Sequence, residues 1–179
     1  MTVPASTRLR VALVGAGYVA THHLAALTQL DFVDVVGICD PQLSAAQALA
    51  DRFGVKRVAA RLDDLADLQP QAVYVLTPPA FHAAIALQAM EMGCHVLVEK
   101  PMADTVADCE SMIAAARLRK LQLGVNHSDL FDPVVMQALQ AVRDGRIGDV
   151  VSVEIVRHSE RSEERRVGEE CRSRWWPYH

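Results

Sequence analysis

Paired cysteines and metal-ligand clusters are both missing from this sequence of 179 residues. Its four cysteines stand alone, with no Cys-x-x-Cys motif or other paired spacing. This pattern argues against a disulfide-stapled scaffold and favours a reducing cytoplasm, where isolated thiols behave as small apolar groups. Histidine, cysteine and acidic residues show no metal-ligand spacing, so we predict no metal site. The cysteines are Cys39, Cys94, Cys109 and Cys171.

Long apolar runs and an excess of positive charge are also absent. No run is long enough to span a bilayer, and the first ten residues lack the apolar core of a signal peptide. The formal net charge is −4, so neither a nucleic acid nor a membrane surface is the expected partner. Because 51% of the residues are apolar, the chain can bury a sizeable core. Its length allows one domain, or one domain and part of a second.

What the sequence does contain is a regular alternation of β-type and helical segments. This alternation predicts an α/β fold, a doubly wound parallel sheet of the Rossmann type with right-handed crossovers. The expected strands are 9–14, 33–39, 55–60 (a short edge strand at best), 73–76, 94–98 and 121–125. The expected helices are 18–30, 42–53, 63–68 (one or two turns), 81–92, 104–120 and 133–143.

The same reading divides the chain into four parts. Residues 1–8 are a loose terminus, and 9–126 form a dinucleotide-binding domain. Residues 127–160 begin a second, α+β domain for substrate binding and oligomerisation, with its first strand at 150–156. Residues 161–179 are dense in charge and have neither helical nor strand periodicity; they resemble the translation of a sequencing adapter more than a solvated tail. We exclude this last part from fold reasoning.

A glycine-rich loop follows the first predicted strand directly. In Gly15-Ala16-Gly17-Tyr18-Val19-Ala20, Gly15 permits the tight turn and Gly17 lets the backbone approach a pyrophosphate at the helix N-terminus. Tyr18 and Val19, which open the helix, are also predicted cofactor-binding residues. Glycines at a strand end are also common turn residues, so this loop alone is a weak signal.

Asp40 ends the second predicted strand, a little over twenty residues beyond the glycines. An acid at this place accepts hydrogen bonds from ribose hydroxyls and repels a 2′-phosphate, which favours NAD over NADP. The alternative is that Asp40-Pro41 only starts the turn before the next helix.

The stretch from Cys94 to Met102 ends a β-type run in Glu99-Lys100-Pro101. Ligands of parallel α/β sheets bind just beyond the carboxyl ends of the strands, so Glu99 and Lys100 lie where chemistry is expected. Pro101 fixes its own φ and biases Lys100 towards an extended backbone. The alternative is a surface Glu-Lys pair that merely ends a strand.

In this order and spacing, the motifs resemble the Gfo/Idh/MocA oxidoreductases, from about Leu9 to about His158. The resemblance implies an NAD(P)-dependent dehydrogenase of a sugar, cyclitol or related polyol, assembled as a homo-oligomer, of which this chain is the amino-terminal half and poorly active by itself. The motifs that carry it are Gly15 to Ala20 with His23, Ile38 to Pro41, Thr77-Pro78-Pro79 with His82, Gly93 to Pro101, and Gly145 to Val150.

The resemblance also assigns roles to single residues. Lys100 matches the catalytic lysine, which helps move the hydroxyl proton while hydride passes to or from the nicotinamide. Residues that match cofactor positions are Gly15, Gly17, Asp40, Thr77, Pro78 and Glu99. Two other functions stay open, namely an NAD-binding sensor or partner module without catalysis, and NAD-assisted elimination or hydrolysis on the same scaffold.

Three further positions are ambiguous from sequence. His23 lies one turn inside the first predicted helix and is expected to be a packing residue. His82 is expected to hydrogen-bond either the cofactor or loop backbone, and we include it among the cofactor contacts. Asn126-His127 follows the sixth strand at the same sheet edge, so cleft contacts are expected there and Asn126 is a further predicted cofactor-binding residue.

Overall fold

The computed structural model describes residues 8–154 and 156. It divides into two compact units, Met1–Phe131 and Asp132–His179, which are considered separately. The predicted tail at 161–179 and the first seven residues lie outside the described part of the chain. Within that part, no helix has the length and apolar character needed to cross a membrane.

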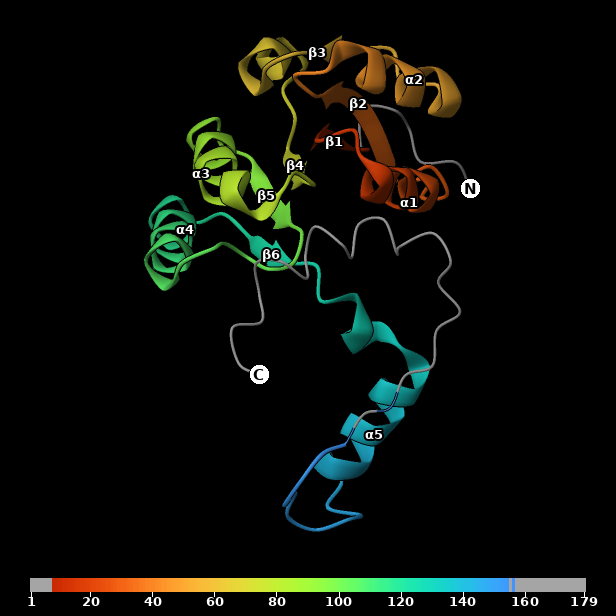
Figure 1. Cartoon of the computed structure of the whole chain (residues 1–179), viewed down its shortest axis with the longest axis vertical. Helices are drawn as coiled ribbons and strands as arrows, with labels where there is room; N and C mark the ends of the chain where they lie inside the picture. Colours follow the sequence, from red (N-terminus) through yellow and green to blue (C-terminus); the bar gives the residue numbers. More distant parts are fainter. Residues whose placement is uncertain (1–7, 155, 157–179) are drawn as a thin grey trace, which may run out of the picture. The chain divides into compact units, whose positions relative to one another are not determined.

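The first unit is built on a six-stranded sheet in the order β3-β2-β1-β4-β5-β6 (Figure 1). All of its pairings are parallel, so the predicted doubly wound sheet is confirmed. The strands are β1 (Leu9–Val14), β2 (Val33–Cys39), β3 (Val58–Ala59), β4 (Ala72–Val75), β5 (His95–Val98) and β6 (Leu123–Val125).

The order of the strands reverses beside β1. The chain runs outward from β1 to β2 and β3, then returns to place β4 on the other side of β1. Strands β1 and β4 pair over Val11–Val14 and Ala72–Val75. The loops that leave their carboxyl ends therefore diverge to opposite faces, and the crevice between them is the usual ligand site of such sheets.

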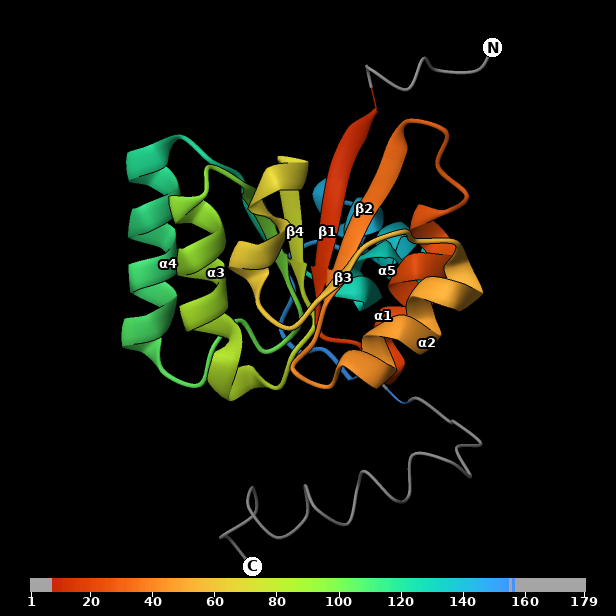
Figure 2. The same ribbon diagram turned by 90° about the horizontal axis from the view of Figure 1, so that it is seen from above.

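Helices cover both faces of the sheet. Figure 2 shows α1 and α2 on one face and α3 and α4 on the other. Gly54 ends α2 with φ +73°, and Thr105 caps the start of α4 by accepting a hydrogen bond from the Asp108 amide at 3.1 Å. The helices are α1 (Tyr18–Leu27), α2 (Leu43–Phe53), α3 (His82–Glu91) and α4 (Val106–Arg119), with 3-10 turns at Leu62–Leu68, Pro79–Phe81 and Ser128–Phe131.

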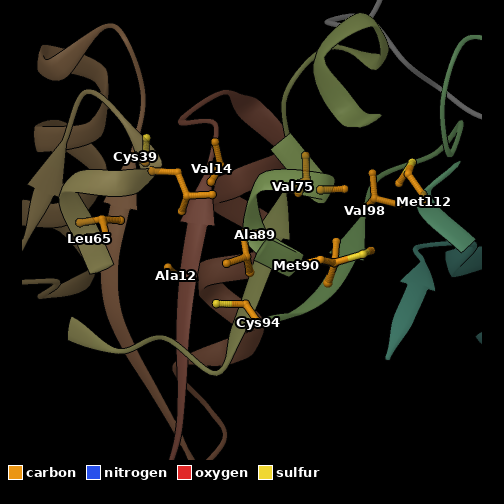
Figure 3. Close-up of a cluster of buried hydrophobic side chains, with 14 of the residues drawn as sticks. Ala12, Val14, Cys39, Leu65, Val75, Ala89, Met90, Cys94, Val98 and Met112 are labelled. Atoms are coloured by element: carbon orange, nitrogen blue, oxygen red, sulfur yellow. The ribbon is translucent and has the colours of Figure 1, made fainter. Parts of the chain in front are cut away.

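Each face of the sheet has its own apolar core. On one face, Leu24 of α1 and Ala46 of α2 pack over Val11 and Leu13. On the other, side chains of α3 and α4 and of the 3-10 turn Leu62–Leu68 cover the sheet, as Figure 3 shows for Met90, Met112 and Leu65. Because β1 is buried from both sides, it reads in sequence as a continuous apolar run, as central parallel strands do.

The second unit contains α5 (Pro133–Arg143), which begins at the predicted proline. The Asp132 carboxylate caps it by accepting a hydrogen bond from the Val134 amide at 2.8 Å. The strand predicted at 150–156 is not formed, because the described residues 150–154 and 156 are in no strand. A strand needs a partner for its backbone groups, and no strand of the described residues pairs with this segment.

Candidate active site

A cavity of about 530 Å³ opens at the carboxyl ends of β1, β2 and β4. Its lining includes Gly15, Gly17, Asp40, Thr77 and Pro78, all of which sequence reasoning placed around a cofactor. The cavity therefore lies at the reversal of strand order, where open α/β sheets bind their ligands.

Gly15 and Gly17 shape the loop between β1 and α1 in different ways. Gly15 has φ +104°, and a Cβ there would lie 2.7 Å from the Leu76 carbonyl oxygen, so only glycine fits. Gly17 has φ −77°, and a Cβ there would meet no atom within 4 Å. The fold itself does not require glycine at this second position, whereas a ligand that approaches the backbone would.

Asp40 holds the glycine loop from the end of β2. Its Oδ2 accepts a hydrogen bond from the Ala16 amide at 2.7 Å, and its Oδ1 accepts one from the Gln42 amide at 2.8 Å. Asp40 thus starts the turn before α2, as the second sequence interpretation held, and it also braces the glycine loop; its contact with a ribose stays a prediction. A carboxylate has about four lone-pair sites, so acceptor capacity remains for ribose hydroxyls.

Thr77 presents a polar atom that has no partner. Its hydroxyl oxygen is buried and makes no hydrogen bond, although it belongs to a residue of the cavity lining. Buried hydroxyls without partners are uncommon and call for an explanation. Together with the open side of Gly17 and the free acceptor capacity of Asp40, it makes this edge of the sheet a fit for a dinucleotide.

Glu99 is the centre of a hydrogen-bond network at the end of β5. Its Oε1 accepts hydrogen bonds from the Asn126 side-chain amide at 2.5 Å and from His23 Nε2 at 2.9 Å. Its Oε2 accepts one from the Lys100 amide at 3.1 Å. Burial by itself raises the pKa of Glu99, but the hydrogen bonds from Asn126, His23 and Lys100 together hold this pKa below its ordinary value.

The contact of His23 corrects the sequence-based expectation of a packing role. Its ring does pack edge-on against Tyr74, at 5.5 Å between centroids, yet its Nε2 is committed to Glu99. A signal for this was present in the sequence. On α1 the buried positions are Ala20, Leu24 and Leu27, and His23 lies three residues after Ala20 on the same side. A polar ring on an apolar face needs a hydrogen-bond partner.

The structure also corrects the predicted cofactor contact of His82, which is fully buried. Its Nε2 lies 2.7 Å from the Thr77 carbonyl oxygen and its Nδ1 lies 2.9 Å from the Pro101 carbonyl oxygen. Both ring nitrogens are therefore used by loop backbone, the second of the two roles that the sequence left open. The ring ties the loop after β4 to the loop after β5.

Replacing His82 by alanine is expected to lower the free energy of unfolding by about 2–4 kcal/mol, because it leaves a cavity and removes the partner of two backbone carbonyls. Urea denaturation measures the change. The matched control is His22→Ala, since His22 is exposed on α1 and its loss should cost less than about 0.5 kcal/mol. Equal stability of the two variants would contradict the linking role of His82.

Lys100 lies directly after β5 and its side chain is exposed. The hydrogen bond from its amide to Glu99 fixes its main chain, while its ammonium group belongs to none of the ion pairs formed among the described residues. An amine on a fixed backbone at the carboxyl edge of a parallel sheet is well placed for proton transfer to a ligand held there.

The remaining predicted residues occupy the same edge or its surroundings. Tyr18 and Val19 are exposed at the start of α1, and His127 is exposed after β6. Cys39 is not a nucleophile, since burial, followed by the negative charge of Asp40, raises the pKa of its thiol to about 11. Among residues 8–154 and 156, no three histidine, cysteine or acidic side chains are grouped as for a metal ion.

The fold and the cavity define a dinucleotide-binding α/β domain. The particular family follows from sequence, because residues 9–127 match the model of the Gfo/Idh/MocA oxidoreductase family, described by its NAD-binding Rossmann fold. The chain belongs to this family, and NAD is its cofactor class.

Named relatives agree with this assignment. D-glucoside 3-dehydrogenase of Escherichia coli strain K12 is 35% identical over 150 residues, which cover 81% of this chain and 42% of the relative. Inositol 2-dehydrogenase 1 of Saccharopolyspora erythraea is 33% identical over 159 residues, which cover 86% and 47% respectively. The crystal structure of GenD2 from gentamicin A biosynthesis in complex with NAD has a TM-score of 0.75 and 33% identity, covering 82% of this chain and 41% of that one. The chain spans less than half the length of these relatives.

Proposed function

We propose that this chain supplies the NAD site and the proton-transfer lysine of a dehydrogenase that acts on a sugar, cyclitol or related polyol. The observation that carries the proposal is the position of Lys100, held by its amide to Glu99 at the sheet edge that also bears the glycine loop and the cavity. D-glucoside and inositol are the substrates in the names of two relatives, which supports this substrate class.

The proposed division of labour is simple. Bound nicotinamide supplies the hydride chemistry. The backbone at Gly15 and Gly17 receives the pyrophosphate, and Asp40 accepts hydrogen bonds from the adenosine ribose. Thr77, Pro78 and Glu99 line the nicotinamide side, and Lys100 takes up or returns the proton of the substrate hydroxyl. In the direction of oxidation, Lys100 would take up the proton of the substrate hydroxyl, while bound NAD would supply the hydride acceptor.

Asp40 tests the proposed choice of NAD over NADP. Replacement by alanine is expected to lower NAD affinity about tenfold, because it removes the ribose acceptor and the brace on Ala16. Asp40→Asn keeps an oxygen in place and removes the charge, so the preference for NAD over NADP should fall. Isothermal titration calorimetry with both cofactors measures these changes.

The matched control for this experiment is Asp34→Asn, since Asp34 is an exposed acid on β2, the strand that Asp40 follows. The Asp34→Asn variant should leave the affinities for NAD and for NADP unchanged. Tighter binding of NADP than NAD by the unmodified chain would refute the proposed role of Asp40. The homo-oligomer and the cytoplasmic location expected from the sequence stay predictions.

A further inference from the structure

Three segments far apart in the sequence meet at the Glu99 carboxylate. His23 comes from α1, 76 residues before Glu99, and Asn126 follows β6, 27 residues after it. The side chains of His23 and Glu99 are each only 12% exposed. Both carboxylate oxygens are engaged, Oε1 by the two side chains and Oε2 by the Lys100 amide.

We propose that His23 and Asn126 are positioning residues for proton transfer, which act on Lys100 through Glu99. The inference rests on the proposed function of Lys100 and adds the residues that set its place. None of them needs to touch the substrate for this role. A lysine side chain has four flexible bonds, so its reach is defined only when its own backbone is held, and a misplacement of about 1 Å costs about 10²-fold in rate.

The hydrogen-bond inventory supports an ionised and fully oriented carboxylate. Carboxylate oxygens only accept hydrogen bonds, whereas the NH2 group of the Asn126 side chain and the Lys100 backbone N–H only donate. His23 must therefore carry a proton on Nε2, the nitrogen that faces Glu99. The edge-on contact with Tyr74 fixes the plane of the imidazole ring. Three donors on one carboxylate leave Glu99 a single orientation, which in turn fixes the direction of the Lys100 amide.

The groups that face Glu99 are few in number. His23 approaches from α1 with Tyr74 of β4 behind it, Asn126 approaches from the end of β6, and Lys100 is its chain neighbour. The lowered pKa of Glu99 agrees with this arrangement. A carboxyl whose pKa is lowered by folding contributes stability above its unfolded pKa, and this contribution is lost as the pH falls through the folded value. The network should therefore open only in acid, below the ordinary range of a glutamate.

The first test uses the 179-residue chain and needs no catalysis. The NMR signal of the Lys100 amide should report the titration of Glu99, with a midpoint below the ordinary glutamate value. His23→Phe keeps a ring against Tyr74 but removes the donor, and Asn126→Leu removes the other donor, so each should move the midpoint upward. His23→Gln restores an N–H and should bring the midpoint back towards that of the unmodified chain.

The control for this experiment is His22→Phe. His22 neighbours His23 on α1 but is exposed and contacts the Tyr18 ring, at 4.7 Å between centroids. The His22→Phe variant should leave the titration midpoint reported by the Lys100 amide signal unchanged. An unchanged midpoint in both His23→Phe and Asn126→Leu would overturn the proposal, because Glu99 would then not be held by these side chains.

The second test measures turnover in the complete enzyme. His23→Phe and Asn126→Leu should each lower kcat about 10- to 100-fold. His23→Phe should change NAD affinity less than threefold, and His23→Gln should recover most of the loss in kcat. A shifted midpoint with unchanged kcat would overturn the positioning role, since the network would then serve only the fold. Full turnover in Lys100→Ala would instead contradict the proposed function itself. This outcome differs from an unchanged midpoint and from a shifted midpoint with unchanged kcat, which contradict only the positioning role.

Discussion

Replacing Lys100 by alanine is expected to lower kcat of the complete enzyme by about 10²–10⁴-fold, the range of a positioned general acid or base. NAD affinity should change little. The side chain of Lys100 is exposed beyond the end of β5, and its contact with Glu99 is made by the backbone amide, which alanine retains. The network around Glu99 should therefore survive the substitution, and so should the cofactor cavity.

Steady-state kinetics and NAD calorimetry on the same preparation separate the two effects. Lys56→Ala is the matched control, since Lys56 is equally exposed and lies before β3, outside the cavity lining. The Lys56→Ala variant should keep full activity. Full activity of Lys100→Ala would instead remove this lysine from the mechanism and favour the NAD-binding module without catalysis that the sequence left open.

The two glycines of the first loop should respond oppositely to substitution by alanine. Gly15→Ala forces a Cβ to 2.7 Å from a backbone oxygen at φ +104°, a conformation that L-residues rarely adopt. Neither the strand end nor the Leu76 carbonyl can move without disturbing the pairing of β1 with β4. We expect the free energy of unfolding to fall by about 3 kcal/mol or more, with loss of NAD binding as a consequence.

Gly17→Ala should instead leave the fold intact. Its φ of −77° suits alanine, and the added methyl meets no protein atom within 4 Å, so stability should change by less than about 0.5 kcal/mol. The methyl group would, however, stand where the pyrophosphate approaches the backbone, and NAD affinity should fall about tenfold or more. Urea denaturation and calorimetry on both variants decide the matter. Undiminished NAD binding by Gly17→Ala would contradict the proposed cofactor position.

Most of the fold was predictable because its signals are local. The strands of the sheet are short, mostly apolar runs, and some helix ends carry a local signal, such as Gly54 at the end of α2 and the capping residue Thr105 at the start of α4. The second unit was predicted less well. Apolar residues alternate along 150–156 as in a strand, yet this alternation indicates only which face of a strand would be buried, not whether the strand finds a partner. Pairing depends on neighbours that the described part of the chain does not offer this segment.

The sequence by itself determined the alternation that builds a parallel sheet, the glycine loop, and the acid and lysine at two strand ends, because these depend on residue type and spacing along the chain. Only the tertiary structure decided what the histidines do. His82 and His23 are the same residue type, but their contacts differ. His82 is buried between two loop carbonyls, whereas His23 donates a hydrogen bond to Glu99. Their partners come from other elements of the fold, so spacing along the chain carries no record of them. The position of Lys100 at a strand end was predictable from the sequence, whereas the network that holds it forms only when the fold brings His23, Glu99 and Asn126 together.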